Sequence, residues 1–106
     1  MIVCVIEFGT APGMEARRRT LVAEMIVEAQ TIEGFISKET FASLDDPDKV
    51  ITLSYWQDRA ALDRWMRNAE HRRVIPQGRN ELFTHYTIQL AEVVSEKTWK
   101  KATPLP

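Results

Sequence analysis

The stretch VITLSYWQDRAALDRWMRNAEH, residues 50–71, decides the fold because it joins a strand to a helix. Val50–Trp56 alternates its larger side chains between two faces, which predicts a β-strand. Asp58 belongs to the residue types that cap helix N-termini. Apolar residues then recur at helical spacing, at Ala60, Ala61, Leu62, Trp65, Met66 and Ala69. The stretch therefore predicts a strand, a cap and an amphipathic helix in direct succession.

Towards the C-terminus the pattern predicts one more strand and a tail. Residues 70–75 either continue the helix or form a short turn, and Pro76 and Gly78 are expected to end it. Residues 83–94 alternate as a long strand. Residues 95–106 have no periodicity and are predicted to form a C-terminal tail.

Towards the N-terminus the pattern predicts two further strands and a helix. A strand at 2–8 is apolar on both faces, which indicates burial from both sides. A helix follows at 14–30, with Thr10 as its expected cap and Pro12 in its first turn. Gly34 ends that helix, and a strand at 35–42 forms a hairpin with Val50–Trp56 through an Asp- and Pro-containing turn at 43–48.

The predicted order is β-α-β-β-α-β, the ferredoxin-like α+β arrangement, with a four-stranded antiparallel sheet in one domain over residues 1–94. Both helices would cover one face of that sheet. The other face would carry Ile51, Leu53 and Tyr55, and soluble monomers rarely expose such an apolar patch. We therefore expect a homodimer with two sheets packed face to face, and Trp99 suggests that part of the tail lies against a surface.

Composition excludes several classes of protein. The 106 residues carry 14 basic and 15 acidic side chains, a formal net charge of −1, which predicts neither nucleic-acid nor membrane binding. The apolar run at residues 2–6 is too short to span a membrane. Cys4 is the sole cysteine, which suits a reducing compartment, and we expect a cytoplasmic protein. With two histidines and one cysteine, no metal site is expected.

Several segments together resemble the antibiotic biosynthesis monooxygenase (ABM) family. They are the aromatic–Trp end of the third strand, the Ala-Ala-Leu helix start, the Trp at position 65, the Ala-Glu-His that follows, the Glu33-Gly34-Phe35 entry to the second strand, and the Tyr86-Thr87-Ile88 of the last strand. The resemblance covers residues 1–94. It implies a dimeric α+β barrel, and it implies a monooxygenase that needs no cofactor and oxidises a small electron-rich aromatic with dioxygen.

The same resemblance implies a pocket between the helices and the sheet. Trp65 and His71 would lie near one wall, with His71 as the base and Trp65 stacked on the substrate. The catalytic candidates are His71, Trp65 and Asn68; the substrate-binding candidates are Phe35, Trp56, Arg72, Phe83 and Tyr86. Asn68, Arg72 or Tyr86 would donate a hydrogen bond to the developing oxyanion.

Other interpretations of these residues stay open at this point. Trp65 is equally well explained as core filling, and His71 as a helix-end residue. A non-catalytic protein that binds a hydrophobic ligand in the same pocket is the alternative function. Haem-degrading members of the family carry an Asn on the first strand and a His ten residues beyond the helix Trp. Here the first strand has no Asn and that later position is Ile75, so haem cleavage is not expected.

Overall fold

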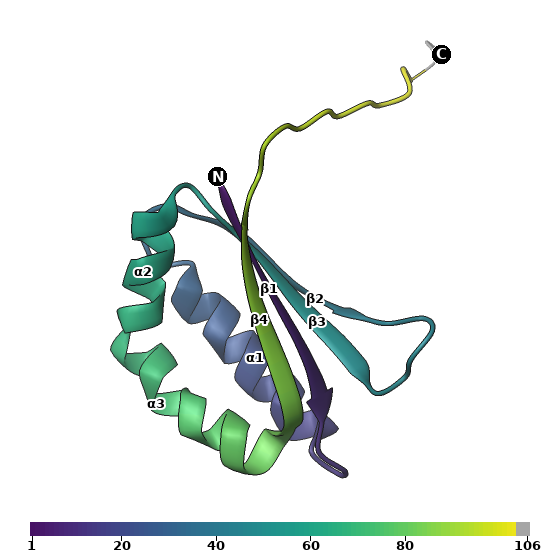
Figure 1. Cartoon of the computed structure of the whole chain (residues 1–106), viewed down its shortest axis with the longest axis vertical. Helices are drawn as coiled ribbons and strands as arrows, with labels where there is room; N and C mark the ends of the chain where they lie inside the picture. The colour runs from purple at the N-terminus through teal and green to yellow at the C-terminus, as the bar shows by residue number, and fades with distance from the viewer. Residues whose placement is uncertain (104–106) are drawn as a thin grey trace.

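The computed structural model of this chain describes residues 1–103 and consists of one antiparallel sheet with its helices on a single face (Figure 1). In chain order the elements are β1 (Ile2–Thr10), α1 (Glu15–Ala29), β2 (Phe35–Ala42), β3 (Lys49–Trp56), α2 (Arg59–Arg67), α3 (Ala69–Gln77), a π-helical turn η1 (Gly78–Leu82) and β4 (Phe83–Glu92). The predicted βαββαβ order and four-stranded antiparallel sheet are confirmed.

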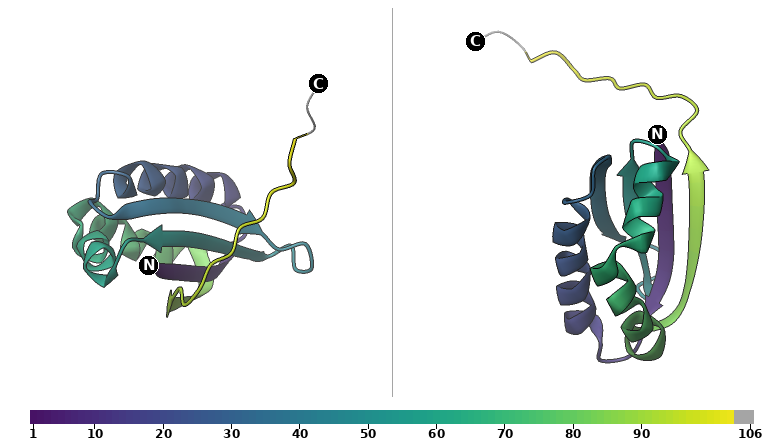
Figure 2. Two further views of the ribbon diagram at one scale, coloured as in Figure 1. Left: turned by 90° about the horizontal axis from the view of Figure 1, so that it is seen from above. Right: turned by 90° about the vertical axis from the view of Figure 1, so that its left-hand side faces the viewer.

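The sheet has the strand order β2-β3-β1-β4, so that β1 and β3 are the inner strands. Each neighbouring pair is antiparallel. The right-hand view in Figure 2 shows all the helices to one side of the sheet and no part of the chain against the other side. One face of the sheet is therefore enclosed and the other is open.

The register of the strands fixes which side chains share a face, because directly paired residues of antiparallel strands point the same way. The enclosed face carries Cys4, Ile6 and Phe8 of β1, Thr52, Ser54 and Trp56 of β3, and Tyr86 and Ile88 of β4. The open face carries Val3 and Val5 of β1, Ile51, Leu53 and Tyr55 of β3, and Phe41 of β2. Apart from the ion pair of Glu7 and Lys49 at one end, the inner strands are apolar on the open side, as the sequence predicts.

Strand β2 contains an irregularity that changes its alternation. Phe35 pairs with Trp56 and Ser37 with Tyr55, so Ile36 has no partner of its own. This extra residue is a β-bulge, which re-aims the side chains that follow it. Lys38 consequently shares the enclosed face with Phe35 instead of the open one.

Helix α1 starts without the cap that the sequence predicts. Thr10 is the last residue of β1 and pairs with Phe83, so the prediction that it caps the helix is wrong. Met14 occupies the N-cap position and its side chain accepts no capping hydrogen bond. At α2 the prediction is confirmed, because the Asp58 side chain accepts a hydrogen bond from the backbone N–H of Ala61 at 2.9 Å.

The residues after α2 form a helix of their own. Asn68 leaves the helical conformation, with ψ of 131°, and α3 begins at the next residue. The prediction that Pro76 ends the helix is wrong, since it lies inside α3 and the chain continues through Gly78 into the wider turns of η1. A proline has no backbone N–H, so Pro76 leaves out the helical hydrogen bond that the carbonyl of Arg72 would otherwise accept.

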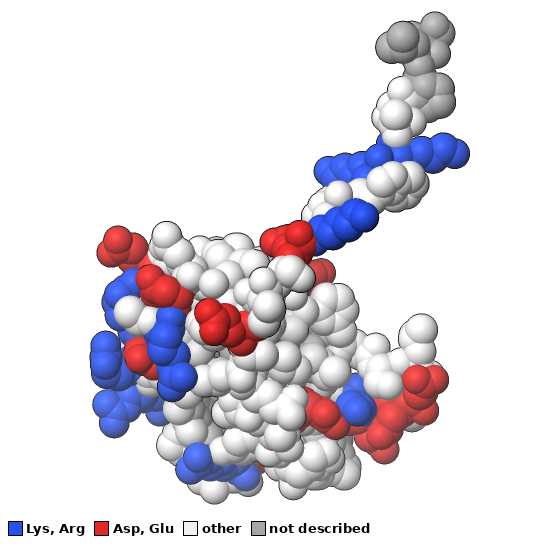
Figure 3. All heavy atoms as spheres, turned by 45° about the horizontal axis from the view of Figure 1, so that its top comes forward, with Lys and Arg blue, Asp and Glu red and all other residues white. Residues whose placement is uncertain are grey.

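The surface separates into charged and uncharged regions. Figure 3 shows basic and acidic side chains interspersed over the helices, acidic ones gathered at the β2–β3 hairpin, and a broad uncharged area between. Within residues 1–103, no helix combines the length and the hydropathy needed to cross a membrane. Residues 93–103 form neither helix nor strand and extend away from the body, with Trp99 77% exposed (Figure 1). The predicted tail also includes residues 104–106, which lie outside the described residues.

Candidate functional site

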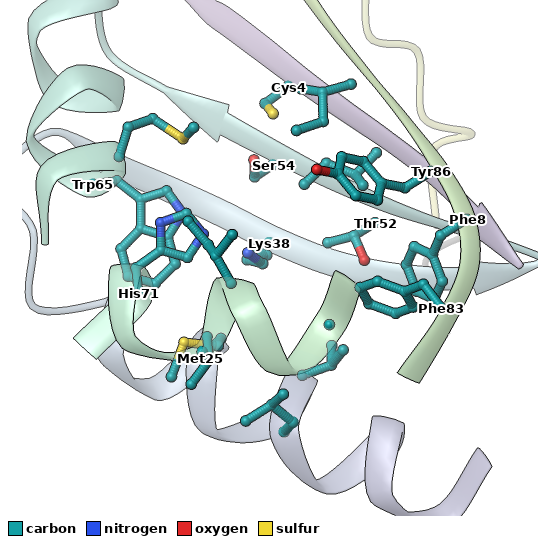
Figure 4. A pocket seen from close by; sticks show the side chains of 18 of the residues that line it. Cys4, Phe8, Met25, Lys38, Thr52, Ser54, Trp65, His71, Phe83 and Tyr86 are labelled. Atoms are coloured by element: carbon teal, nitrogen blue, oxygen red, sulfur yellow. The ribbon is translucent and has the colours of Figure 1, made fainter. Parts of the chain in front are cut away.

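A cavity of about 220 Å³ lies between the helices and the enclosed face of the sheet (Figure 4). Its wall is formed by Cys4, Ile6, Phe8, Leu21, Val22, Met25, Lys38, Thr52, Ser54, Trp65, Met66, His71, Val74, Ile75, Gly78, Arg79, Phe83, Tyr86 and Ile88. Most of these side chains are apolar, and the few polar groups among them converge from different elements. Ligand sites in proteins typically have this composition.

A stacked pair of rings forms one end of the cavity. The ring centroids of Trp65 on α2 and His71 on α3 are 4.3 Å apart, and their planes differ by 20°. Six residues apart on one continuous helix, the two side chains would point about 120° away from each other. The break at Asn68 brings them face to face, and the Asn68 side chain fixes the break by accepting a hydrogen bond from the His71 backbone N–H at 3.0 Å.

The environment of His71 keeps its imidazole neutral. Burial, followed by the charge of Lys38, lowers the pKa of His71 to about 4, and a backbone group of Trp65 opposes this in part. The Nδ1 atom of His71 is buried and has no hydrogen-bond partner among the described residues. A neutral imidazole carries one lone pair and one N–H, so this ring can accept a proton or a hydrogen bond from a ligand.

Further aromatic rings support the stacked pair from behind. Trp65 stacks on Trp56 at 6.1 Å between centroids, and Trp56 meets the edge of Phe35 at 5.4 Å. Trp56 is fully buried, and its Nε1 donates a hydrogen bond to the Ser54 hydroxyl at 2.9 Å. This row of rings locks the orientation of Trp65, because each neighbour is itself held in place.

Lys38 brings a positive charge to the centre of the cavity. The bulge in β2 turns its side chain inward, where Nζ lies 5.0 Å from the centroid of the Trp65 ring. Figure 4 shows the amine between the Trp65–His71 pair and Thr52. Burial lowers the pKa of Lys38 to about 8, against the opposing influence of Cys4. At pH 7 the amine is still predominantly protonated.

The other end of the cavity is built around Phe83 and Tyr86. The Phe83 ring packs on Phe8 at 4.5 Å between centroids and faces the edge of Tyr86 at 6.4 Å. Arg79 of η1 donates a hydrogen bond from Nε to the Tyr86 hydroxyl at 2.6 Å. Gly78 allows this arrangement, since a Cβ there would lie 2.9 Å from the Phe83 ring. This end is therefore aromatic with a polar rim.

The sequence matches a family profile over most of the elements that enclose the cavity. The family is described as antibiotic biosynthesis monooxygenase, and the match covers residues 1–77. The chain belongs to this family. For this ABM protein the matched region includes Lys38, Trp65 and His71, whereas β4 lies beyond it.

Known relatives of this ABM protein agree with the assignment. The jasmonate monooxygenase ABM of Pyricularia oryzae is 26% identical over 95 residues, 90% of this chain and 44% of that protein, so this chain spans less than half of its length. The solved structure of Rv0793 from Mycobacterium tuberculosis superposes with a TM-score of 0.81 at 19% identity, over 92% of this chain and 98% of that one. SnoaB, a cofactor-independent oxygenase from Streptomyces nogalater, gives 0.79 at 16% identity, over 90% and 94%. At these identities the solved structures show the shared fold.

Four of the residues predicted for the site line the cavity, and four do not. Trp65, His71, Phe83 and Tyr86 are in its wall. Outside it lie Phe35, Trp56, Asn68 and Arg72. Phe35 and Trp56 occupy the enclosed face but sit behind Trp65 in the core.

The two polar residues outside the cavity wall, Asn68 and Arg72, contact other parts of the protein or solvent. The side chain of Asn68 is engaged on both sides, since its Oδ1 caps α3 and its Nδ2 donates to Glu28 at 3.2 Å. Arg72 is exposed on α3. The structure thus places neither of these two where it would meet a ligand in the cavity.

The sequence prediction did not include Lys38 or Arg79. Simple alternation from Phe35 assigns Lys38 to the open face, and only the bulge at Ile36 reverses this. Arg79 follows the helix end expected at Pro76 and Gly78, and the sequence pattern assigns no element to it. The strand also carries Ser37, Glu39 and Thr40, so the presence of a lysine in it gave no indication of a site residue. Within residues 1–103, no group of three or more His, Cys, Asp or Glu side chains is positioned to bind a metal ion.

Proposed function

We propose that this ABM protein is a cofactor-independent monooxygenase that oxidises a small electron-rich aromatic, such as a phenol, quinol or anthrone, with dioxygen. The observation that carries the proposal is the neutral His71 stacked on Trp65 in the wall of an apolar cavity. A neutral imidazole has a lone pair that can accept a proton, and because a pKa of about 4 makes it a weak base, the transfer requires the cavity to stabilise the substrate anion that forms. The names of the jasmonate monooxygenase and of SnoaB point to the same class of reaction.

The reaction balances without an external reductant. His71 accepts a proton from the substrate, and the resulting anion transfers one electron to dioxygen. The two radicals then combine, which forms a carbon–oxygen bond and a peroxide. His71 returns its proton to the peroxide, the remaining C–H proton is lost, and the O–O bond breaks to give a carbonyl and water. For an anthrone the CH₂ group plus O₂ becomes C=O plus H₂O, and the substrate supplies all the electrons.

The size of the cavity limits the substrate. An apolar cavity of about 150 Å³ accommodates benzene. At about 220 Å³, the cavity of this protein suits one or two fused rings better than a polycycle of four. We therefore expect naphthol- or naphthoquinol-sized compounds to react faster than larger ones.

Oxygen uptake tests the proposed reaction. The purified protein would be placed in an oxygen electrode with phenols, naphthols, quinols and anthrones, beside His71→Ala and the surface control Arg73→Ala. Uptake that requires the protein, falls roughly a hundredfold in His71→Ala and persists in Arg73→Ala would support the proposal. Uptake unchanged in His71→Ala would rule out His71 as the base. A ligand-induced rise in melting temperature without any uptake would favour the non-catalytic binding protein instead.

We also propose that the protein acts as a homodimer in which a second copy covers the open face of the sheet. The support is the apolar row of Val3, Val5, Ile51, Leu53 and Tyr55 on that face, which no element within residues 1–103 covers. Soluble monomers rarely keep a patch of this kind. The cavity lies on the opposite side of the sheet, so dimerisation would leave its lining unchanged.

A further inference from the structure

The charged groups in the cavity wall are all of one sign. Its two strongly basic residues are Lys38 and Arg79, and no Asp or Glu is among the described residues that line it. Arg79 stands at the rim, exposed and hydrogen-bonded to Tyr86. Lys38 lies at the centre, and it takes part in none of the ion pairs formed within residues 1–103. An ammonium group in an apolar cavity without a counter-ion is unfavourable, so its presence calls for an anionic partner.

The surroundings of Lys38 suit an anion that is attached to an aromatic ring. Its amine lies over the face of Trp65, and Ser54 is its direct partner on β3. The hydroxyls of Ser54 and Thr52 are buried beside it. A ligand ring placed against Trp65 and His71 would bring an attached acidic oxygen to the ammonium group, which has three N–H donors.

We infer that Lys38 is the anion-binding residue of this cavity, and that the ligand is an aromatic acid whose carboxylate or phenolate oxygen pairs with its ammonium group. This inference rests in part on the proposed function, because in the reaction Lys38 would stabilise the oxyanion that forms when His71 removes a proton. The pairing itself requires no oxygen chemistry. It makes Lys38 a specificity-determining residue that selects acidic ligands over neutral ones of the same shape.

The test compares two probes of nearly equal shape, 2-naphthoate and 2-naphthamide. Their dissociation constants would be measured by quenching of tryptophan fluorescence in the wild type, in Lys38→Met and in Lys49→Met. The last variant removes the same charge from a lysine that pairs with Glu7 outside the cavity. We expect Lys38→Met to weaken naphthoate binding at least tenfold and to leave naphthamide binding within twofold. Lys49→Met should leave both within twofold.

The pH dependence provides a second readout. Cys4 of β1 and His71 of α3 are the other titratable groups that influence Lys38, and Arg79 and Tyr86 complete the ionisable groups of the wall. The naphthoate carboxylate stays ionised above pH 6. Its affinity should therefore fall as pH rises through about 8, where Lys38 loses its charge. Naphthamide binding, and naphthoate binding to Lys38→Met, should not show this fall.

The outcomes separate this inference from the proposed reaction. If the wild type binds naphthoate no more tightly than naphthamide, or if Lys38→Met weakens both equally, the inference is wrong even when oxygen uptake is observed. If naphthoate selectivity depends on Lys38 while no aromatic in the panel is oxidised, the inference stands and the proposed monooxygenase reaction fails.

Discussion

The two faces of the sheet differ in where their polar and apolar side chains lie. The face that the helices cover has polar groups near its middle, where Lys38, Thr52 and Ser54 adjoin the cavity. The face that no element of residues 1–103 covers is apolar at the corresponding rows, with Val5, Leu53 and their neighbours. In a simple two-layer protein the covered face is apolar and the open face polar. The polar groups in the middle of the covered face and the apolar row on the open face both depart from that pattern, which supports the proposals of a bound ligand and of a second copy.

Under the two proposals, each face carries residues that serve binding more than the stability of the isolated chain. On the enclosed face, polar groups that weaken the core surround a ligand-sized cavity. On the open face, half-buried apolar groups would become fully buried against the proposed second copy. The four changes below test these assignments, in order of decreasing expected effect.

Leu53→Glu should abolish the proposed dimer, because it places a charge at the centre of the open face. A buried unpaired charge at an interface typically costs several kcal/mol, so the dissociation constant should rise by about a hundredfold or more. Light scattering at micromolar concentration measures the mass. Phe41→Glu, at the edge strand, should weaken the dimer less, and Ala23→Glu on the exposed side of α1 should not change it. If the wild type is a monomer, the proposal that a second copy covers the open face is wrong.

Lys38→Met should stabilise the folded protein at pH 7. Burial holds the pKa of Lys38 at about 8, below its ordinary 10.5, so folding is penalised while the amine is charged. With about 1.36 kcal/mol per pKa unit, removing the charge should add about 3 kcal/mol to the free energy of unfolding. The gain should shrink as pH rises from 8 to 10.5, as chemical denaturation at several pH values would reveal. A loss of stability at pH 7 would mean that the ammonium group is not penalised by its site.

His71→Phe should reduce the loss of folding stability that the wild type shows as the pH falls. The pKa of His71 is lowered from 6.5 to about 4, so between these two pH values the imidazole is protonated in the unfolded chain and neutral in the folded protein. The wild type should therefore lose stability as pH falls from about 6.5 to 4, by about 2 kcal/mol after allowance for solvent screening. The phenylalanine variant keeps an aromatic partner for Trp65 and should lack this component. Parallel profiles for both proteins would contradict the burial assigned to His71.

Asn68→Ala should affect stability more than ligand binding. Its side chain caps α3 and bonds to Glu28 outside the cavity wall. Loss of an N-cap costs about 1 kcal/mol, which denaturant unfolding resolves. Naphthoate affinity should change less than threefold. A larger loss of affinity at unchanged stability would show that Asn68 acts directly on the ligand, as the sequence suggested.

Much of the fold could be predicted because its determinants are local. Alternation in β3, the Asp58 cap and the helical spacing of α2 each act within a few residues, and together they fix the order of the elements. The placement of Trp65 beside His71 could not be predicted from local pattern. The family resemblance implied it, and the helical spacing did not. Their contact depends on the break at Asn68, which the sequence left open as either a longer helix or a turn.

Two features of the site could not be predicted: how far a side chain lies behind the cavity wall, and on which side of the sheet Lys38 lies. Trp56 and Phe35 point to the enclosed face, but the packing of three successive rings places them behind the cavity wall. Such depth follows from tertiary packing and has no local pattern. For Lys38, a single unpaired residue in β2 reverses the alternation that the sequence suggests. No strong turn-forming residue marks that position, since Ile36 is a good strand former.

The bulge at Ile36 has a consequence for how this chain can vary over generations. Deleting that one residue would make β2 regular and leave every other pairing unchanged, so that Phe35 and Lys38 would still point to the cavity side of the sheet. The bulge can therefore absorb the loss of one residue from this strand without altering the charge of the ligand chamber.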